Sequence, residues 1–188
     1  TPSGTSRKLF IEIVRPSLEK LITQGRIGAW GITGIGEPDS VLKTLGEAPR
    51  PAIVQVISNI LDSPGGLKFF DGPSKAREII AVANRYNIAV MGIRALQAGA
   101  LTRRFDRKVE PAHPDMQDYR KAEKFRELAR DIGESPTSLA LRYSLSMKGV
   151  STLVIGPKNR LELRECLSAE REGSLSKNIV DAIDASVK

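Results

Sequence analysis

Four short stretches of the chain are almost continuously apolar and rich in β-branched residues. They are residues 27–33, 52–59, 88–94 and 151–155. Hydrophobic and polar positions barely alternate within them, which is typical of parallel strands buried on both faces. The pattern therefore predicts four buried strands in a parallel sheet.

The segments between these stretches carry apolar residues at helical spacing. In residues 74–86, Ala76, Ile79, Ile80 and Ala83 follow positions i, i+3, i+4 and i+7, which directs one stripe toward a core. A second segment, 121–132, has the same spacing at Ala122, Phe125, Leu128, Ala129 and Ile132. Both are predicted to be core-facing helices.

Two helix boundaries carry clear signals. Ser135 and Pro136 form an N-cap followed by proline at the first helical position. A first helix is predicted over about 7–23, where Pro16 is expected to kink it and Gly25 to close it. The helix that starts at Pro136 carries Leu139, Ala140, Tyr143 and Met147 on one side.

Strand–helix alternation along the chain predicts a parallel α/β architecture, with two helices between the third and fourth strands. Four such units are half of an eight-stranded barrel, and half a barrel exposes two strand edges and an apolar face. An open doubly wound sheet would avoid this exposure. However, Gly31, Gly34 and Gly36 have the spacing G-x-x-G-x-G, not the G-x-G-x-x-G of a dinucleotide fold, and indicate only a turn.

Composition narrows the class of protein. The 188 residues carry 29 basic and 22 acidic side chains, a net charge of +7, which favours phosphate-bearing partners. Acidic and basic residues are interleaved, so nucleic acid is a poor candidate partner. Neither a membrane span nor a secretory leader is expected. A lone cysteine, Cys166, and a lone histidine, His113, argue against an internal disulfide or an ordinary zinc site and indicate a cytoplasmic location.

The best candidate for chemistry follows the fourth strand. Asn159 is a good N-cap with Glu162 at capping-box spacing, and Lys158 and Arg160 lie beside it. A helix N-terminus with basic neighbours favours an anion, so the segment reads as a phosphate site of a nucleotide. A well-capped surface helix with solvated charges is the alternative.

Other candidates are weaker. Arg94, at the end of the third strand, could reach a pyrophosphate or pair with a carboxylate in a barrel mouth. Gln55, within an apolar strand, could bind a carboxamide or satisfy neighbouring backbone. The stretch 102–118 is predicted to be a long exposed loop, with His113 solvated in it. Cys166 shares an apolar stripe with neighbouring leucines (Leu163 and Leu167) and is expected to pack in the core.

Five segments in this order resemble the C-terminal half of the aldo-keto reductases. They are residues 24–33, 54–56, 94–102, 135–143 and 154–165. The resemblance implies the last four strands of a (β/α)8 barrel followed by C-terminal helices. It also implies that residues 1–188 form a single partial domain whose N-terminal half lies outside this chain.

The resemblance further implies a nicotinamide cofactor, NADP or NAD, extended across the strand ends. Thr33 and Gln55 match positions that hold the carboxamide, and Ile93 matches the position of a ring-stacking aromatic residue. The loop around the pyrophosphate corresponds to Arg94, Leu96, Ala98 and Gly99. The adenosine end corresponds to Ile155, Gly156, Lys158, Glu162, Glu165 and Cys166.

Departures from the family pattern affect cofactor choice. Gly34 and Cys166 stand where the family has asparagine, and Ile93 supplies only an aliphatic contact. Glu162 replaces a residue that meets the 2′-phosphate, and a carboxylate there repels phosphate. Lys158 remains the argument for NADP over NAD.

No catalytic or metal-binding residue is assigned in this chain, because the family's aspartate, tyrosine, lysine and histidine belong to the other half. The intact parent is therefore expected to be an oxidoreductase that reduces aldehydes or ketones, or oxidises the alcohol, by hydride transfer. A small carbonyl compound is its expected substrate, and this chain alone is expected to be inactive. A non-catalytic, reductase-like binding or regulatory module is the alternative. Self-association, or pairing with the N-terminal half, is expected to cover the open sheet.

Overall fold

The computed structural model describes residues 6–187 and contains one parallel sheet of four strands. The strands are β1 (Gly31–Thr33), β2 (Ile53–Ile57), β3 (Ala89–Ile93) and β4 (Thr152–Leu153). Their spatial order is their sequence order, β1-β2-β3-β4, and Thr33, Gln55, Met91 and Thr152 lie in one row across the sheet. Each strand lies within a stretch predicted from the apolar pattern, so the prediction of parallel (β/α) units is confirmed.

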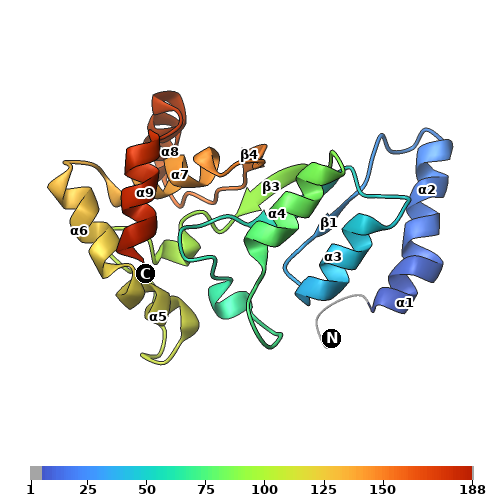
Figure 1. The fold of residues 1–188 in the computed structure, drawn as a ribbon, viewed down its shortest axis with the longest axis horizontal. Helices are drawn as coiled ribbons and strands as arrows, with labels where there is room; N and C mark the ends of the chain where they lie inside the picture. The colour runs from blue at the N-terminus through green and yellow to red at the C-terminus, as the bar shows by residue number, and fades with distance from the viewer. Residues whose placement is uncertain (1–5, 188) are drawn as a thin grey trace.

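Helices connect and follow the strands (Figure 1). They are α1 (Arg7–Leu9), η1 (Phe10–Val14), α2 (Arg15–Thr23), α3 (Pro38–Gly46), η2 (Gly65–Leu67), α4 (Ala76–Arg85), η3 (Gln97–Gly99), α5 (Pro114–Lys121), α6 (Glu123–Asp131), α7 (Pro136–Ser146), α8 (Arg160–Glu172) and α9 (Lys177–Ser186). Three long helices, α5, α6 and α7, lie between β3 and β4, where two were predicted.

The first helical stretch runs as predicted from Arg7 to Thr23, but its irregularity precedes the proline. Residues Phe10–Val14 form a π-helical turn that ends two residues before Pro16, which stands in the first turn of α2. A wider turn relieves the clash of the proline ring with the preceding carbonyls. Gly25 ends the stretch at φ 66°, in the left-handed conformation that favours glycine.

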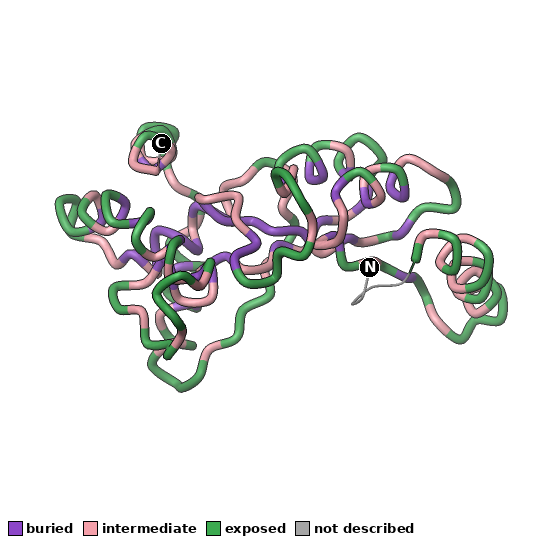
Figure 2. The backbone as a smooth tube through the Cα atoms, turned by 90° about the horizontal axis from the view of Figure 1, so that it is seen from below, coloured by how far each residue is buried: buried purple, intermediate pink, exposed green. Residues whose placement is uncertain are grey.

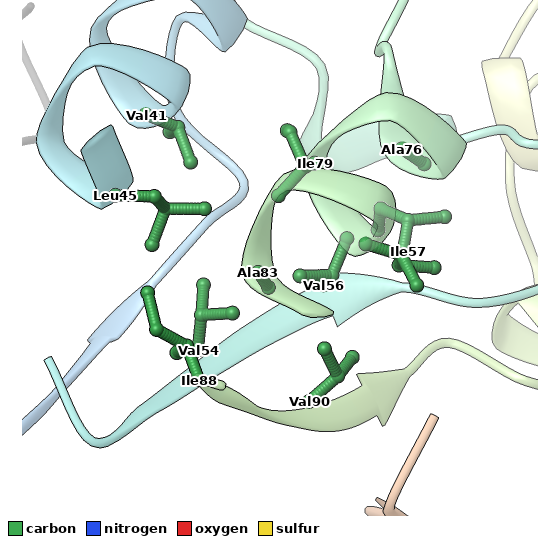
Figure 3. Packing of buried hydrophobic residues seen from close by; sticks show 11 residues of the cluster. Val41, Leu45, Val54, Val56, Ile57, Ala76, Ile79, Ala83, Ile88 and Val90 are labelled. Atoms are coloured by element: carbon green, nitrogen blue, oxygen red, sulfur yellow. The ribbon is translucent and has the colours of Figure 1, made fainter. Parts of the chain in front are cut away.

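One hydrophobic core fills the space between the sheet and helices α3 and α4 (Figure 3). Val54, Val56 and Val90 point from the strands toward Leu45 of α3 and Ile79 of α4, and all five are at most 1% exposed. The stripe predicted in α4 is confirmed, since Ala76, Ile79, Ile80 and Ala83 are all buried. This packing fixes which face of each strand is the core face.

A second core joins α6, α7 and α9 at the other end of the molecule. Its largest members include Phe125, Leu139, Tyr143 and Ile183, and each of these is at most 2% exposed. Phe125 comes from the stripe predicted for the second helical segment, although Leu128 is half-buried and Ile132 is exposed.

The opposite face of the sheet is open. Side chains alternate along a strand, so the neighbours of the core-facing valines point away from α3 and α4. Gly31 and Thr33 on this face are exposed, and Ile53, Gln55 and Met91 are only half-buried. Figure 2 shows the tubes of α3 and α4 on one side of the buried strands. The strands β1 and β4 are the two edges of the sheet.

The prediction of an exposed loop over 102–118 is wrong in its second half. Residues Pro114–Lys121 form α5, whose N-cap is His113: the imidazole Nδ1 accepts a hydrogen bond from the Asp115 N–H at 3.1 Å. His113 is therefore a half-buried capping residue, not a solvated one. The order His113-Pro114 repeats the N-cap and proline order of Ser135-Pro136, which is the signal that could have revealed this helix.

We predict that the 188-residue chain self-associates through its open sheet face and edges. Replacing the exposed Thr152 on edge strand β4 by lysine should weaken association at least about tenfold, because an edge lysine opposes strand pairing. Sedimentation velocity over a concentration series measures the effect. Thr23→Lys, at an exposed position on α2, is the control and should leave association unchanged. A monodisperse wild-type monomer at high concentration would contradict the prediction.

Candidate functional site

The residues carried over from the family resemblance gather along the carboxyl ends of the parallel strands. Thr33 is the last residue of β1 and Ile93 the last of β3, and Arg94 follows directly. Residues 155–158 form the turn after β4, which leads into α8. Ligand sites of parallel α/β folds lie at this end of the sheet because the loops that vary are there.

Two polar side chains face the open side of the sheet next to each other. Thr33 Oγ1 donates to Gln55 Oε1 at 3.3 Å, and Gln55 Nε2 donates to Met91 Sδ at 3.5 Å. Both contacts are long, and a thioether is a weak acceptor. The Gln55 amide therefore keeps hydrogen-bonding capacity for an amide ligand, and the pair fits a carboxamide.

The loop after β3 has an unusual backbone. Arg94, Gln97 and Ala98 have φ values of 56°, 46° and 51°, and Gly99 has 94°. Left-handed conformations at residues with side chains are costly and gather at functional sites, where the surrounding structure must hold them in place.

Asp115 holds Arg94 in its left-handed conformation through an ion pair. Arg94 donates from Nε to Gln97 Oε1 at 2.8 Å and from Nη2 to Asp115 Oδ1 at 2.6 Å. Arg107 pairs with the other Asp115 oxygen, and the Gly66 N–H donates to Oδ1 at 2.9 Å. Of the two alternatives for Arg94, the structure shows the one with a carboxylate partner.

Asp115 itself is 1% exposed, so its charge depends on these partners. Burial alone would raise the pKa of Asp115, but the Gly66 N–H, Arg94 and Arg107 together hold that pKa below its ordinary value. The carboxylate therefore stays ionised and ties the loop after β2, the loop after β3 and α5 together.

A second polar group adjoins this pair. Asp118 Oδ2 accepts from Ser63 Oγ at 2.6 Å and from Gln97 Nε2 at 2.5 Å, and Gln97 Oε1 accepts from Asn59 Nδ2 at 3.2 Å. Gln97 and Asn59 are fully buried. Gln97, Asp115 and Asp118 are not predicted by the sequence pattern, because both aspartates fall in the stretch expected to be a solvated loop.

The turn after β4 is confirmed as a capped helix start. Asn159 Oδ1 accepts from the N–H groups of Leu161 and Glu162 at 2.9 and 3.0 Å, and Glu162 Oε2 accepts from the Lys158 N–H at 2.7 Å. Lys158 Nζ pairs with Asp106 and lies 3.6 Å from Glu162. Asp106, and to a smaller extent Glu162, raise the pKa of Lys158. A phosphate at this turn would therefore compete with two carboxylates for one lysine.

Glu165 and Cys166 lie one turn further along α8. Glu165 accepts a hydrogen bond from the Ser135 hydroxyl at the start of α7. Cys166 is 7% exposed and packs with Ala95, Leu141 and Ala169, and burial raises the pKa of its thiol. Core packing of Cys166 is confirmed, but its supposed stripe partners are not buried: Leu163 and Leu167 are 41% and 46% exposed.

Two clefts lie elsewhere on the described part of the chain. One of about 600 Å³ lies between the β2–α4 loop and α5, and one of about 820 Å³ lies between α5, α6 and the start of α7. Neither is lined by the carried-over residues. Within residues 6–187, no group of three His, Cys, Asp or Glu side chains could hold a metal ion, and no helix is long and apolar enough to cross a bilayer.

Comparison with known proteins identifies the class to which this fold and site belong. The sequence model of the Aldo/keto reductase family matches residues 3–188, so the chain belongs to this family. Aldo-keto reductases generally use nicotinamide cofactors.

Two solved structures share the fold of this chain, and a curated protein is similar to it in sequence. The chain is similar to aldo-keto reductase AKR11C1 from Bacillus halodurans in its holo form, with a TM-score of 0.74, 18% identity, and coverage of 98% of this chain and 59% of that one. Its apo form gives a TM-score of 0.69, 18% identity, and coverage of 92% and 56%. L-galactose dehydrogenase from Arabidopsis thaliana is 25% identical over 157 residues, which are 84% of this chain and 46% of that protein. The chain thus spans about half the length of the curated relative it matches.

Replacing Asp115 by asparagine should lower the free energy of unfolding at neutral pH by about 3 kcal/mol, because it leaves the Arg94 guanidinium without its buried counter-charge. The folded-state pKa of Asp115 is depressed, so its stabilising contribution is present above the unfolded-state pKa, about 4, and is lost as pH falls through the folded-state value. Urea denaturation from pH 3 to pH 7 tests both statements.

The asparagine variant should lose this part of the pH dependence. Asp71→Asn, at an exposed position in the β2–α4 loop, is the control and should unfold like the wild type. An Asp115→Asn protein as stable as wild type at neutral pH would show that the ion pair contributes nothing.

Proposed function

We propose that the protein containing this chain is an NAD(P)-dependent oxidoreductase, which reduces an aldehyde or ketone, or oxidises the corresponding alcohol, by hydride transfer. In this proposal residues 1–188 are a partial domain that supplies the cofactor-binding half of a barrel. The observation that carries the proposal is the Thr33–Gln55 pair on the open sheet face beside the loop after β3. The Gln55 amide makes only long hydrogen bonds there, at 3.3 and 3.5 Å, and so can bind a ligand amide. Family membership supports the same assignment.

Apart from the buried Cys166, each carried-over residue has a definite task in this proposal. Thr33 and Gln55 hold the nicotinamide carboxamide, and Ile93 offers an apolar surface to its ring. The loop of Arg94, Leu96, Ala98 and Gly99 wraps the pyrophosphate, and the turn and helix start at Ile155, Gly156, Lys158, Glu162 and Glu165 meet the adenosine. The bound nicotinamide supplies the hydride. Because Asp115 occupies one edge of the Arg94 guanidinium, we expect Arg94 to shape this loop as much as to contact phosphate.

The proton donor of the reaction comes from outside this chain in our proposal. The chain has three tyrosines: Tyr119 and Tyr143 lie within α5 and α7, and Tyr86 is the C-cap of α4. Tyr143 is 2% exposed, and burial and its hydrogen bond to Asp184 raise its pKa to about 12. A phenol in that state is a poor general acid at neutral pH.

A non-catalytic binding or regulatory module is the second candidate. The observation that favours it is the internal pairing of Lys158 with Asp106 and Glu162, which neutralises the one lysine expected to attract a cofactor phosphate. The two candidates differ in whether the longer protein turns over a carbonyl substrate with a nicotinamide cofactor.

Replacing Lys158 by alanine in the protein that contains this chain should weaken NADP binding about fivefold and leave NAD nearly unchanged, because only NADP carries the 2′-phosphate. Isothermal titration calorimetry with both cofactors measures the two affinities. Lys177→Ala is the matched control, since Lys177 also pairs with a carboxylate, Asp181, at 2.6 Å but lies on α9. Equal losses for both cofactors, or no loss, would make Lys158 a solvated helix-start charge.

The 188-residue chain alone should show no cofactor-dependent carbonyl reduction, because the carbonyl oxygen needs a proton donor beside it when the carbonyl carbon accepts the hydride. Absorbance of the reduced cofactor at saturating concentration, with a panel of aldehydes and ketones, measures turnover. A preparation of the Gln55→Ala variant is the control for contaminating reductases. Turnover that is present in the wild-type chain and absent from that variant would contradict the proposal that the proton donor lies outside this chain.

A further inference from the structure

Gln97, in the loop after β3, is a fully buried amide whose donors and acceptors are all used. Its Oε1 accepts from Arg94 Nε at 2.8 Å and from Asn59 Nδ2 at 3.2 Å. Its Nε2 donates to Asp118 Oδ2 at 2.5 Å and to Ser63 Oγ at 3.3 Å. A glutamine amide accepts two hydrogen bonds and donates two, so the protein itself saturates this side chain.

The two charged partners of Gln97 determine which kind of side chain fits between them. The guanidinium of Arg94 only donates hydrogen bonds, and the carboxylate of Asp118 only accepts them. The side chain at position 97 must therefore accept on one side and donate on the other. An amide does both, whereas a carboxylate would face Asp118 with a like charge and an ammonium group would face Arg94 with one.

The same contacts tie a strained backbone to two other segments. Asn59 and Ser63 belong to the loop after β2, and Asp118 lies on α5. Gln97 itself has a φ of 46°, and Ala98, the next residue, has a φ of 51°. Left-handed conformations at residues with side chains persist only where the surroundings hold them. The side chain of Gln97 therefore holds the backbone of its own loop in place.

Gln97 also determines which donor of Arg94 remains free. It occupies Nε of that guanidinium, and Asp115 occupies Nη2 at 2.6 Å. Within residues 6–187, Nη1 of Arg94 has no hydrogen-bond partner, and the side chain is 14% exposed. The two buried partners thus fix the orientation of the guanidinium and leave one of its nitrogens for a ligand.

We propose that Gln97 is the positioning residue of the pyrophosphate loop, residues 94–99. It contacts no atom of the cofactor, because its own amide is saturated. It acts by holding the left-handed backbone of the loop and by directing the free nitrogen of Arg94 toward the pyrophosphate. A donor that is already held in its binding geometry loses less entropy when the ligand arrives. This role rests on the proposed function, since it requires a cofactor pyrophosphate on this loop.

The first test replaces Gln97 by methionine, which has a similar length and makes none of the four hydrogen bonds. In the protein that contains this chain, Gln97→Met should weaken binding of both NADP and NAD at least about tenfold, because both carry the pyrophosphate. Adenosine 2′-monophosphate has no pyrophosphate, and its affinity should change less than twofold. Isothermal titration calorimetry measures all three. Wild-type affinity for the cofactors, or equal losses for all three ligands, would overturn the proposal.

A double variant tests whether the hydrogen bond itself is what matters. Gln97→Glu/Asp118→Asn exchanges the amide and the carboxylate across one contact and keeps the net charge. It should bind NADP and NAD at least threefold more tightly than Gln97→Met does. An exchanged pair that binds as weakly as Gln97→Met would contradict the proposed role.

Tyr143→Phe is the matched control for a general loss of stability. Tyr143 is 2% exposed, and its hydroxyl contacts Arg77 at 2.7 Å and also Asp184, so the change removes buried hydrogen bonds from α7. Its affinities for NADP and NAD should stay within twofold of wild type. Losses as large as those of Gln97→Met would show that any weakening of the buried polar groups has the same effect.

Hydrogen exchange of the full 188-residue chain without cofactor separates this role from the proposed function. The N–H groups of Gly99 and Ala100 are hydrogen-bonded within the loop. Gln97→Met should speed their exchange at least tenfold, and Tyr143→Phe should not. Unchanged exchange in Gln97→Met would refute the positioning role. A wild-type protein that binds neither NADP nor NAD would contradict the proposed function, and the exchange result would then decide by itself whether Gln97 holds the loop.

Discussion

The buried carboxylate of Asp115 is the interaction on which the loops of this molecule depend. It accepts from Arg94 and Gly66, pairs with Arg107, and lies one helical turn before Asp118, which binds Ser63 and Gln97. The loops after β2 and β3 therefore share one polar network with α5. Removing a partner from such a network leaves a charge without water or counter-ion, so the arrangement is close to all-or-none. The left-handed residues between Arg94 and Gly99 persist because this network holds them.

The second constraint is that the sheet is covered on one face only. Helices α3 and α4 bury Val54, Val56 and Val90, whereas Thr33, Gln55 and Met91 remain accessible on the other face. In a closed barrel that inner face is filled with side chains from all strands. Here the open face, the two edges, and coverage of 46% of the curated relative and 59% of a solved one are mutually consistent. The same openness leaves the Gln55 amide with only long contacts.

Two basic residues show that the partners of a charged side chain depend on the fold. Lys158 has a suitable position beside a helix N-terminus, but Asp106 and Glu162 already neutralise it. Arg126 lies within an ordinary amphipathic helix, yet its guanidinium is held by backbone carbonyls and by Tyr119 without a carboxylate. Neither set of partners follows from position along the chain.

Local patterns determined much of this protein. Apolar continuity located all four strands, helical spacing located the stripe of Ala76, Ile79, Ile80 and Ala83, and short capping signals located the starts of α7 and α8. These features depend on neighbours within a few residues, so the sequence alone reports them. Tertiary structure decided what depends on residues distant in the chain: that Arg94 faces Asp115, that His113 caps α5, that Leu163 and Leu167 stay exposed beside a buried Cys166, and that Arg126 donates to the carbonyl of Ala100. The free energy of a charge or of an apolar side chain depends on what folding brings next to it, and no periodicity in the sequence records that.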